Sequence, residues 1–340
     1  MLKKFTLSTL VVFGLVLLLS ACGEKSQEDV VKKLDKKLEE MKGYKVKAEM
    51  KMNTGQEDQT YNIDVWHKKK DFYRVALSHN KDEKSSQMIL KNEDGVYVLT
   101  PSLNKSFKFQ TEWPDNSSQP YLFQSLVEDI QKDPEAKFEA NESHYIFHTK
   151  TNYQSNNNLP YQEIHIDKKS YTPTLVKVMD VDNKSLVEVE FSQFDMDPSF
   201  KDKDFVLEEN MKTNSELADV TASSDVTDDV FTFLFPDYTA GAELAEKKEV
   251  DIDDGERMIL TYAGDKNFTL VEEKRDTIPT LSSPQEVEGD IVNLGHTIGV
   301  LTNNSIEWFY QGVNYYLASD ELTKDELINI AQSVTAKEVK

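Results

Sequence analysis

The residues that could carry chemistry in this sequence are its histidines, its carboxylates and a single cysteine. The six histidines are His67, His79, His144, His148, His165 and His296. His144 and His148 are four positions apart, which would bring them together on a helix. Tyr145-Ile146-Phe147 between them favours a strand instead, in which both rings lie on one face about 13 Å apart. This spacing disfavours a metal site, and we expect no bound metal.

Other motifs that would indicate catalysis are missing from the sequence. There is no Gly-rich phosphate loop, no GxSxG elbow and no HExxH pair. Asp251-Ile252-Asp253-Asp254-Gly255 resembles part of a calcium loop, but its Gly comes one position early and the twelfth position holds Tyr262, so a turn is favoured. With 61 acidic residues in the chain, two neighbouring carboxylates do not indicate an acid/base pair. We therefore expect no catalytic residues, no cofactor and no enzymatic activity.

Cys22 has the clearest chemical context of these residues. Lys3 and Lys4 precede an apolar run from Leu7 to Leu19 that is too short for an ordinary membrane span, and the run ends in Leu19-Ser20-Ala21-Cys22. This ending resembles the lipobox of bacterial lipoproteins, in which the thiol accepts a diacylglyceryl group and the chain is cut just before it. The alternative is an ordinary signal peptide with an incidental cysteine. We expect residues 1–21 to be removed and Cys22 to anchor the protein to the outer face of the cell membrane.

The composition narrows the choice of partners. Cys22 is the only cysteine, so no internal disulfide can form. The formal net charge is -22, and removing residues 1–21 takes away two lysines and no acidic residue, so nucleic acid is a poor partner. The same charge argues against adhesion of the polypeptide surface to anionic headgroups, which leaves the Cys22 lipid as the anchor. The 38% hydrophobic and 29% charged residues are typical of globular structure.

Hydrophobic periodicity predicts an α+β first domain over residues 22–210. Ser26 caps an amphipathic helix with Val30, Leu34, Leu38 and Met41 on one face, and a period of two begins at Tyr44. Pro120 opens a second helix that carries the apolar stripe Leu122, Phe123, Leu126, Val127 and Ile130. The expected strands are 44–52, 61–66, 72–77, 87–90, 96–100, 107–109, 144–150, 161–167, 174–180 and 185–194.

A second, smaller α+β domain is expected over residues 231–340, after an acidic Ser/Thr linker at 211–230. Its expected strands are 256–262, 268–272, 296–301, 306–310 and 313–317. Thr323 and Glu326 form a capping box for a last helix, whose buried face is Leu327, Ile330, Ala331 and Val334.

Apolar and aromatic residues alternate with charged ones across the strands of the first domain, which suggests a candidate cavity. Its expected lining is Met50, Met52, Ile63, Val65, Phe72, Met88, Tyr97, Phe107, Phe109, Leu122 and Leu126. Methionine adapts its shape, which suits a pocket for varied acyl chains. The same pattern is produced by a core between a sheet and its helices, and pattern alone favours the core.

Three segments of the first domain resemble the LolA/LolB superfamily, which includes the lipid-binding domain of RseB-type regulators. They are Trp66-His67-Lys68-Lys69-Lys70-Asp71-Phe72-Tyr73-Arg74, Asp94-Gly95-Val96-Tyr97-Val98-Leu99-Thr100-Pro101, and Ile164-His165-Ile166-Asp167 with Leu175. The resemblance covers about residues 26–207 and implies a curved antiparallel half-barrel sheet with helices over its concave apolar face. The lipid on Cys22 would keep this chain on its membrane, so we do not expect it to carry cargo across a periplasm, and we assign no cargo role to Arg74.

The C-terminal part adds a second resemblance. Trp308-Phe309-Tyr310-Gln311-Gly312-Val313-Asn314-Tyr315-Tyr316-Leu317 and the helix that ends in Ile330-Ala331-Gln332-Ser333 resemble a small domain of extracytoplasmic proteins from spore-forming bacteria. Together with the lipobox, the chain resembles sporulation lipoproteins, which implies a role in endospore formation.

Two functional hypotheses follow from these observations. The leading one is a membrane-tethered, non-enzymatic protein that binds a lipid or an acylated ligand, such as a lipoprotein, in the concave face. The alternative is a protein–protein adaptor that scaffolds a cell-envelope or spore-cortex enzyme, with the apolar face serving only as core.

Overall fold

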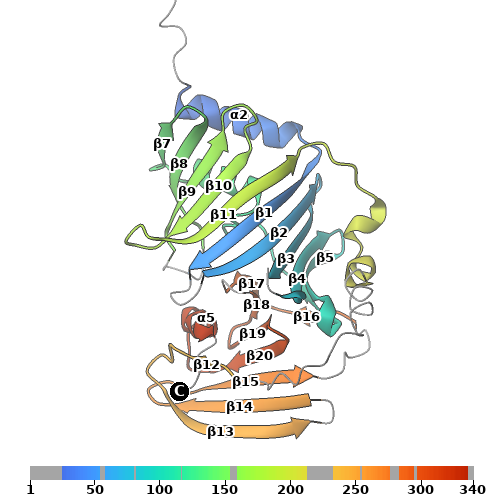
Figure 1. Cartoon of the computed structure of the whole chain (residues 1–340), viewed down its shortest axis with the longest axis vertical. Helices are drawn as coiled ribbons and strands as arrows, with labels where there is room; N and C mark the ends of the chain where they lie inside the picture. The colour runs from blue at the N-terminus through green and yellow to red at the C-terminus, as the bar shows by residue number, and fades with distance from the viewer. Residues whose placement is uncertain are drawn as a thin grey trace, which may run out of the picture.

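The computed structural model describes residues 25–53, 58–79, 82–115, 117–153, 159–212, 233–252, 255–275, 283–294 and 297–335. They form two bodies, each built on one open sheet (Figure 1). The first sheet has 12 strands in the order β16-β6-β5-β4-β3-β2-β1-β11-β10-β9-β8-β7, and the second has 7 in the order β13-β14-β15-β20-β19-β18-β17. The expected α+β class is confirmed, because both large sheets are accompanied by only a few helices.

The first sheet is antiparallel in all its strand pairs except β16–β6, and β1 lies near its middle. Its strands are β1 (Gly43–Asn53), β2 (Asp58–Lys68), β3 (Phe72–His79), β4 (Asp82–Asn92), β5 (Gly95–Thr100), β6 (Lys105–Phe109), β7 (Lys137–Ala140), β8 (His144–Lys150), β9 (Tyr161–Asp167), β10 (Pro173–Met179), β11 (Ser185–Asp195) and β16 (Gln285–Val287). Burial alternates along β1, as the period of two predicts, so that Val46, Ala48 and Met50 lie inside. In the register, Met50 is opposite Tyr61 on one side and Val189 on the other.

Two helices cover the inner face of this sheet. In α2 (Gln27–Glu40), the Ser26 hydroxyl accepts a hydrogen bond from the Asp29 amide at 3.2 Å, as the capping pattern predicts. The second helix, α3 (Phe123–Lys132), begins three residues after Pro120, because the chain first makes a turn in which the Leu122 amide donates to the Gln119 carbonyl. Leu34 of α2 and Leu126 of α3 are fully buried in one core with the inner side chains of β1, β2 and β3.

The opposite face of the sheet carries a separate, smaller core. Met88, Leu90, Tyr97 and Leu99 pack there against the segment that follows β11, which includes the 3-10 helix η2 (Asp202–Phe205). Arg74 fixes this segment, because its Nε donates to Asn210 Oδ1 at 2.8 Å.

The second body has one packed face. Its strands are β12 (Phe235–Pro236), β13 (Glu243–Ile252), β14 (Gly255–Ala263), β15 (Phe268–Arg275), β17 (Asp290–Asn293), β18 (Ile298–Leu301), β19 (Ser305–Tyr310), β20 (Val313–Ala318) and β21 (Val334–Thr335). Helix α5 (Lys324–Ser333) packs on the large sheet, and its expected capping box between Thr323 and Glu326 is present. In the calcium-like segment, Ile252 of β13 pairs with Gly255 of β14, and residues 253–254 lie outside the described residues.

The two bodies are joined by a strand and by side chains. Strand β16 comes from the second half of the chain but pairs in parallel with β6, so it extends the first sheet. The buried Gln87 side chain of β4 accepts hydrogen bonds from the Ile298 amide at 2.8 Å and from the Thr297 hydroxyl at 2.6 Å. A further ion pair joins Lys105 to Glu307. Of the expected linker 211–230, all but its first two residues lie outside the described residues.

Candidate functional site

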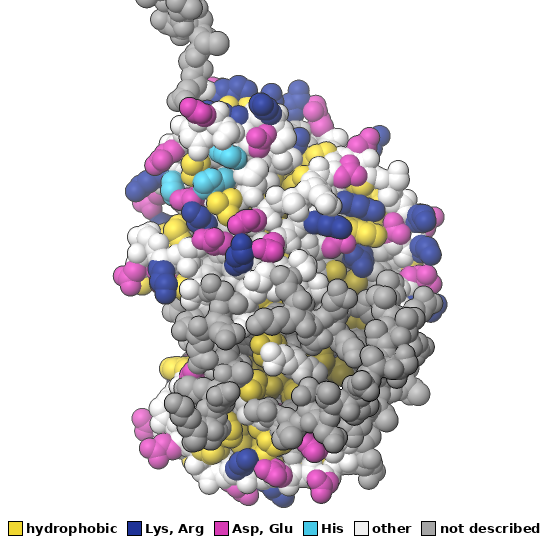
Figure 2. Space-filling model, viewed as in Figure 1, with side chains coloured by type: hydrophobic (Ala, Val, Ile, Leu, Met, Phe, Trp, Pro, Cys, Tyr) yellow, Lys and Arg dark blue, Asp and Glu magenta, His cyan; other side chains and the backbone are white. Residues whose placement is uncertain are grey.

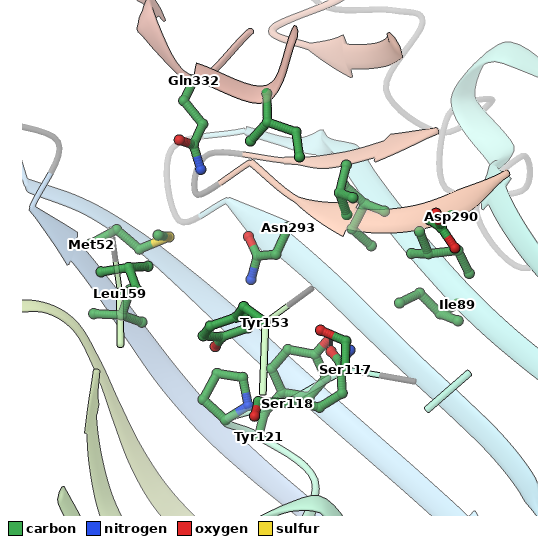
Figure 3. A pocket seen from close by; sticks show the side chains of 17 residues that line it. Met52, Ile89, Ser117, Ser118, Tyr121, Tyr153, Leu159, Asp290, Asn293 and Gln332 are labelled. Carbon is green, nitrogen blue, oxygen red and sulfur yellow. Dashed lines mark hydrogen bonds between the residues drawn. The ribbon is translucent and has the colours of Figure 1, made fainter. Parts of the chain in front are cut away.

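A pocket lies between the two bodies, where the open end of the first sheet meets β17, β18 and α5 (Figure 3). Its volume is about 80 Å³, and it opens to solvent. By volume this holds several water molecules or a short stretch of a hydrocarbon chain. The pocket is lined by Met52, Ile89, Ser117, Ser118, Gln119, Pro120, Tyr121, Tyr153, Leu159, Val187, Asp290, Ile291, Val292, Asn293, Ile298, Ile328 and Gln332.

The apolar part of the lining comes from both bodies. Met52 and Val187 are neighbours on β1 and β11, and Ile89 lies on β4. The second body contributes Ile298 from β18 and Ile328 from α5, both of them buried. An apolar lining with a few polar groups is the usual composition of a small-molecule pocket.

One polar wall is formed by Ser118 and the groups behind it. Its hydroxyl donates to Asp129 Oδ2 at 2.8 Å and accepts from the Asn152 amide at 2.6 Å. The same Asp129 oxygen accepts from Gln162 Nε2 at 2.7 Å. Burial raises the pKa of Asp129 to about 6, although the hydrogen bonds from Gln162 and Ser118 act in the opposite direction. At neutral pH, therefore, most molecules carry a negative charge directly behind this wall.

The rest of this wall is held by hydrogen bonds among its own residues and α3. The Gln119 amide donates to Ser125 Oγ on α3 at 2.8 Å, and the Tyr121 hydroxyl donates to Gln119 Oε1 at 2.8 Å. Burial raises the pKa of Tyr121 above its usual range, and burial also raises that of Tyr153, with the Asp129 carboxylate adding to the effect. Both phenols are therefore neutral at any physiological pH.

The second body supplies two carboxamides and one acid. In Figure 3, Asn293 extends from β17 toward Tyr153, and Gln332 reaches down from α5. Asp290 lies at the far end of the pocket near Ile89, and its Oδ2 is 3.2 Å from the Lys324 ammonium.

The structure distributes the expected cavity residues over three places. Of the eleven, only Met52 lines the pocket. Another seven belong to the main core and have almost no exposed surface: Met50, Ile63, Val65, Phe107, Phe109, Leu122 and Leu126. The remaining three, Phe72, Met88 and Tyr97, pack with the small core on the opposite face, so they cannot belong to the same cavity. The alternation of apolar and charged residues shows which side chains of one strand share a face, but it does not show which faces of different strands lie on the same side of the sheet.

The histidine pair lies on the outer face of the first sheet, away from α2 and α3. His144 and His148 lie on β8, as expected, and pair in register with Asp167 and Glu163 of β9. His165 Nε2 is 2.6 Å from Glu163 Oε1, and Figure 2 shows histidine side chains gathered on this face among charged residues. Within the described ranges, no group of three or more His, Cys, Asp or Glu side chains is arranged to hold a metal ion.

Cys22 lies outside the described residues, which begin at Lys25. Among the helices that the structure describes, none combines the length and the apolar character needed to cross a membrane.

Most of the residues that build the pocket carried no signal in the sequence. Ser117, Ser118 and Tyr153 lie in irregular segments, and Asn293 and Gln332 come from the other half of the chain. The one available hint was Pro120 ahead of a helix, because the residues before a helix start often form a structured turn.

Comparison with known proteins gives clear sequence relatives. A family described as "Sporulation protein YdcC-like" matches residues 2–205. Sporulation protein YdcC of Bacillus subtilis (strain 168) is 48% identical over 326 residues, which cover 96% of this chain and 95% of that protein.

The similar solved structures are more distant. The complex of Pseudomonas aeruginosa MucA/MucB matches with 12% identity and a TM-score of 0.34, over 92% of this chain and 99% of that one. A LolA superfamily protein from Nitrosomonas europaea matches with 10% identity and a TM-score of 0.30, over 54% and 99%. At these TM-scores the likeness to both structures is partial.

Proposed function

The chain belongs to the YdcC-like family of sporulation proteins, and on this premise we propose that it is a membrane-anchored extracytoplasmic protein that binds a lipid-like or acylated ligand without catalysing a reaction. The observation that supports this most is the pocket between the bodies, which combines an apolar lining with a few polar groups. Binding at this site needs no cofactor.

The position proposed for the ligand differs from the centre of the concave face. Met50, Ile63 and Leu126 are each 1% exposed or less, so the middle of that face is filled by α2 and α3 and leaves no space for a chain. The pocket lies instead toward the second body, and among the described residues of β1 it is Met52 that lines it.

The anchor in this proposal is the diacylglyceryl group on Cys22. The lipobox-like Leu19-Ser20-Ala21-Cys22 supports it, and Cys22 lies only three residues before Lys25, the first described residue. Three residues span at most about 11 Å, so the lipid would hold the start of α2 close to the outer face of the membrane. More than one acyl chain is needed for stable anchoring, and this modification supplies at least two.

The test is native mass spectrometry and lipid extraction of the protein purified from its own host. We expect the wild type to carry a ligand and an Ile291→Trp variant to lose it, because the indole would fill the pocket from β17. Val181→Trp is the matched control, since Val181 is 65% exposed in a turn and is not one of the residues that line the pocket. A wild type that is empty in every preparation contradicts the proposal.

A protein–protein adaptor is the second candidate, and the outer face of the second sheet favours it. Ile259, Val271 and Tyr316 form a continuous row across β14, β15 and β20, and the Tyr316 side chain is 42% exposed. A photo-crosslinking residue at position 316 in sporulating cells should capture one defined envelope protein. The same residue at position 238 is the control, because Tyr238 is 44% exposed but lies elsewhere. Equal labelling from both positions contradicts the adaptor function.

A further inference from the structure

We propose that the pocket selects uncharged amphiphiles whose polar part carries hydroxyl groups, such as an acylglycerol or an alkyl glycoside, and rejects amphiphiles that end in a carboxylate or a phosphate. This inference rests on the proposed ligand-binding function and specifies the chemical class of the ligand.

The first argument is the direction of the hydrogen bonds in the pocket wall. Ser118 directs its only hydroxyl proton to Asp129, and Tyr121 directs its own to Gln119. Both oxygens can therefore offer only acceptor lone pairs to a ligand. An acceptor recognises a hydroxyl group, which can donate, whereas a carboxylate or phosphate oxygen has no proton to give.

The second argument is charge. None of the lining residues in the described part of the chain is a lysine, arginine or histidine. The one charged lining residue is Asp290, and its negative charge is already compensated by Lys324 at 3.2 Å. Behind Ser118 stands the Asp129 carboxylate, 2.8 Å from the hydroxyl oxygen. An anionic headgroup in this pocket would lose its hydration without gaining a cation, and it would face a buried negative charge.

The third argument is the chemistry of the remaining polar groups. The carboxamide of Gln332 has both donors and acceptors, which matches hydroxyl and ester groups. Met52, Leu159 and Val187 lie around the same space and would contact the first part of an alkyl chain. The net charge of -22 adds a field that favours neutral over anionic ligands.

The experiment compares three probes with the same ten-carbon chain: decanoylglycerol, decyl glucoside and decanoate. The sample is the Cys22→Ser protein, in which every described residue is unchanged, and binding is measured by calorimetry at pH 7.5 below the critical micelle concentrations. We expect decanoylglycerol or decyl glucoside to bind at least about tenfold more tightly than decanoate, the size of one good hydrogen bond. The ratio of the affinities for decanoylglycerol and decyl glucoside then distinguishes an acylglycerol from a glycosyl lipid as the preferred ligand.

Two variants make the selectivity itself testable. Asp129→Asn keeps an oxygen to accept from Ser118 and Gln162 but removes the charge, so the affinity for decanoate should rise several-fold relative to the affinity for decanoylglycerol. Gln332→Lys places a cation at the pocket and should reverse the preference, and it decides the question if Asp129→Asn does not fold. Decanoate binding as tight as that of the neutral probes overturns this inference and leaves the proposed function standing. If none of the three probes binds, both are overturned.

Discussion

At the scale of single residues, the second body contains a carboxylate in an unusual setting. Glu272 on β15 has no exposed surface, its Oε2 accepts from the Leu234 amide at 3.0 Å, and its Oε1 has no hydrogen-bond partner in the structure. Burial raises the pKa of Glu272 from 4.5 to about 8, and the Leu234 hydrogen bond offsets this only in part. Near neutral pH, the folded protein therefore holds a proton that the unfolded chain releases.

This setting gives the stability a defined pH dependence. Because the folded pKa is above the unfolded one, the contribution of Glu272 is fully present below about pH 4.5 and is lost as the pH rises toward 8. We expect the free energy of unfolding of the wild type to fall by roughly 1 kcal/mol per pH unit relative to that of Glu272→Gln in this window. Urea unfolding of both proteins at pH 5, 6.5 and 8 measures this difference. If the free energies of unfolding of the two proteins changed with pH in parallel, the Glu272 carboxyl would not be protonated in the folded state.

Cys22 is the residue on which localisation depends. A serine at position 22 offers no thiol for the diacylglyceryl transfer, so we expect Cys22→Ser to block lipidation and to leave a precursor or a released soluble protein. The folded bodies should be unaffected, since Cys22 is the only cysteine and closes no disulfide. Cell fractionation with labelled fatty acid measures this. Incorporation of label by Cys22→Ser would contradict our interpretation of the N-terminus.

At the scale of elements, helix α3 separates core from pocket. Leu126 has no exposed surface and packs in the main core, whereas the residues just before the helix line the pocket. We expect Leu126→Asp to unfold the first body, at a cost of at least about 4 kcal/mol, because it removes a buried side chain and buries a carboxylate. Gln131→Asp on the exposed side of α3 is the control. Circular dichroism and thermal unfolding distinguish the outcomes, and a folded Leu126→Asp protein would show that this stripe lines a cavity.

The elements themselves were largely predictable from local pattern. Strands β8 and β9 have the bounds that alternation predicts, and α2 and α5 begin at the expected caps Ser26 and Thr323. Strand β13 was not predicted, because a charged edge strand with both faces exposed has no alternation. The three-residue β16 was also missed, since it exists only through its pairing with β6, a contact between segments far apart in the sequence.

At the scale of the whole molecule, the pocket exists only because two bodies meet. The sequence predicted two domains and indicated an apolar inner face, but nothing local in it indicated that Asn293 and Gln332 line the same pocket as Tyr121. The contact between the two bodies depends on the packing of complementary surfaces, which hydrophobic periodicity does not encode. The ligand site was accordingly expected in the middle of the concave face, where the structure instead places a filled core.

One of the contacts that join the two bodies is testable at Gln87. This buried side chain donates from Nε2 to the Ile298 carbonyl at 3.3 Å, and its Oε1 accepts from the Ile298 amide and from Thr297. Gln87→Leu keeps a similar volume but leaves the backbone groups of Ile298 unpaired, which costs about 1–3 kcal/mol for each buried group.

We expect Gln87→Leu to raise amide hydrogen exchange at Ile298–Leu301 and in the pocket wall around Ser118, while exchange in β14 and β15 stays as in the wild type. Gln131→Leu, on the exposed side of α3, serves as the control for the change of residue type. Because the pocket is lined from both bodies, ligand retention should fall together with the protection of β18. If protection of β18 were lost but ligand retention unchanged, the ligand would be bound by the first body alone, and the second body would have no part in binding.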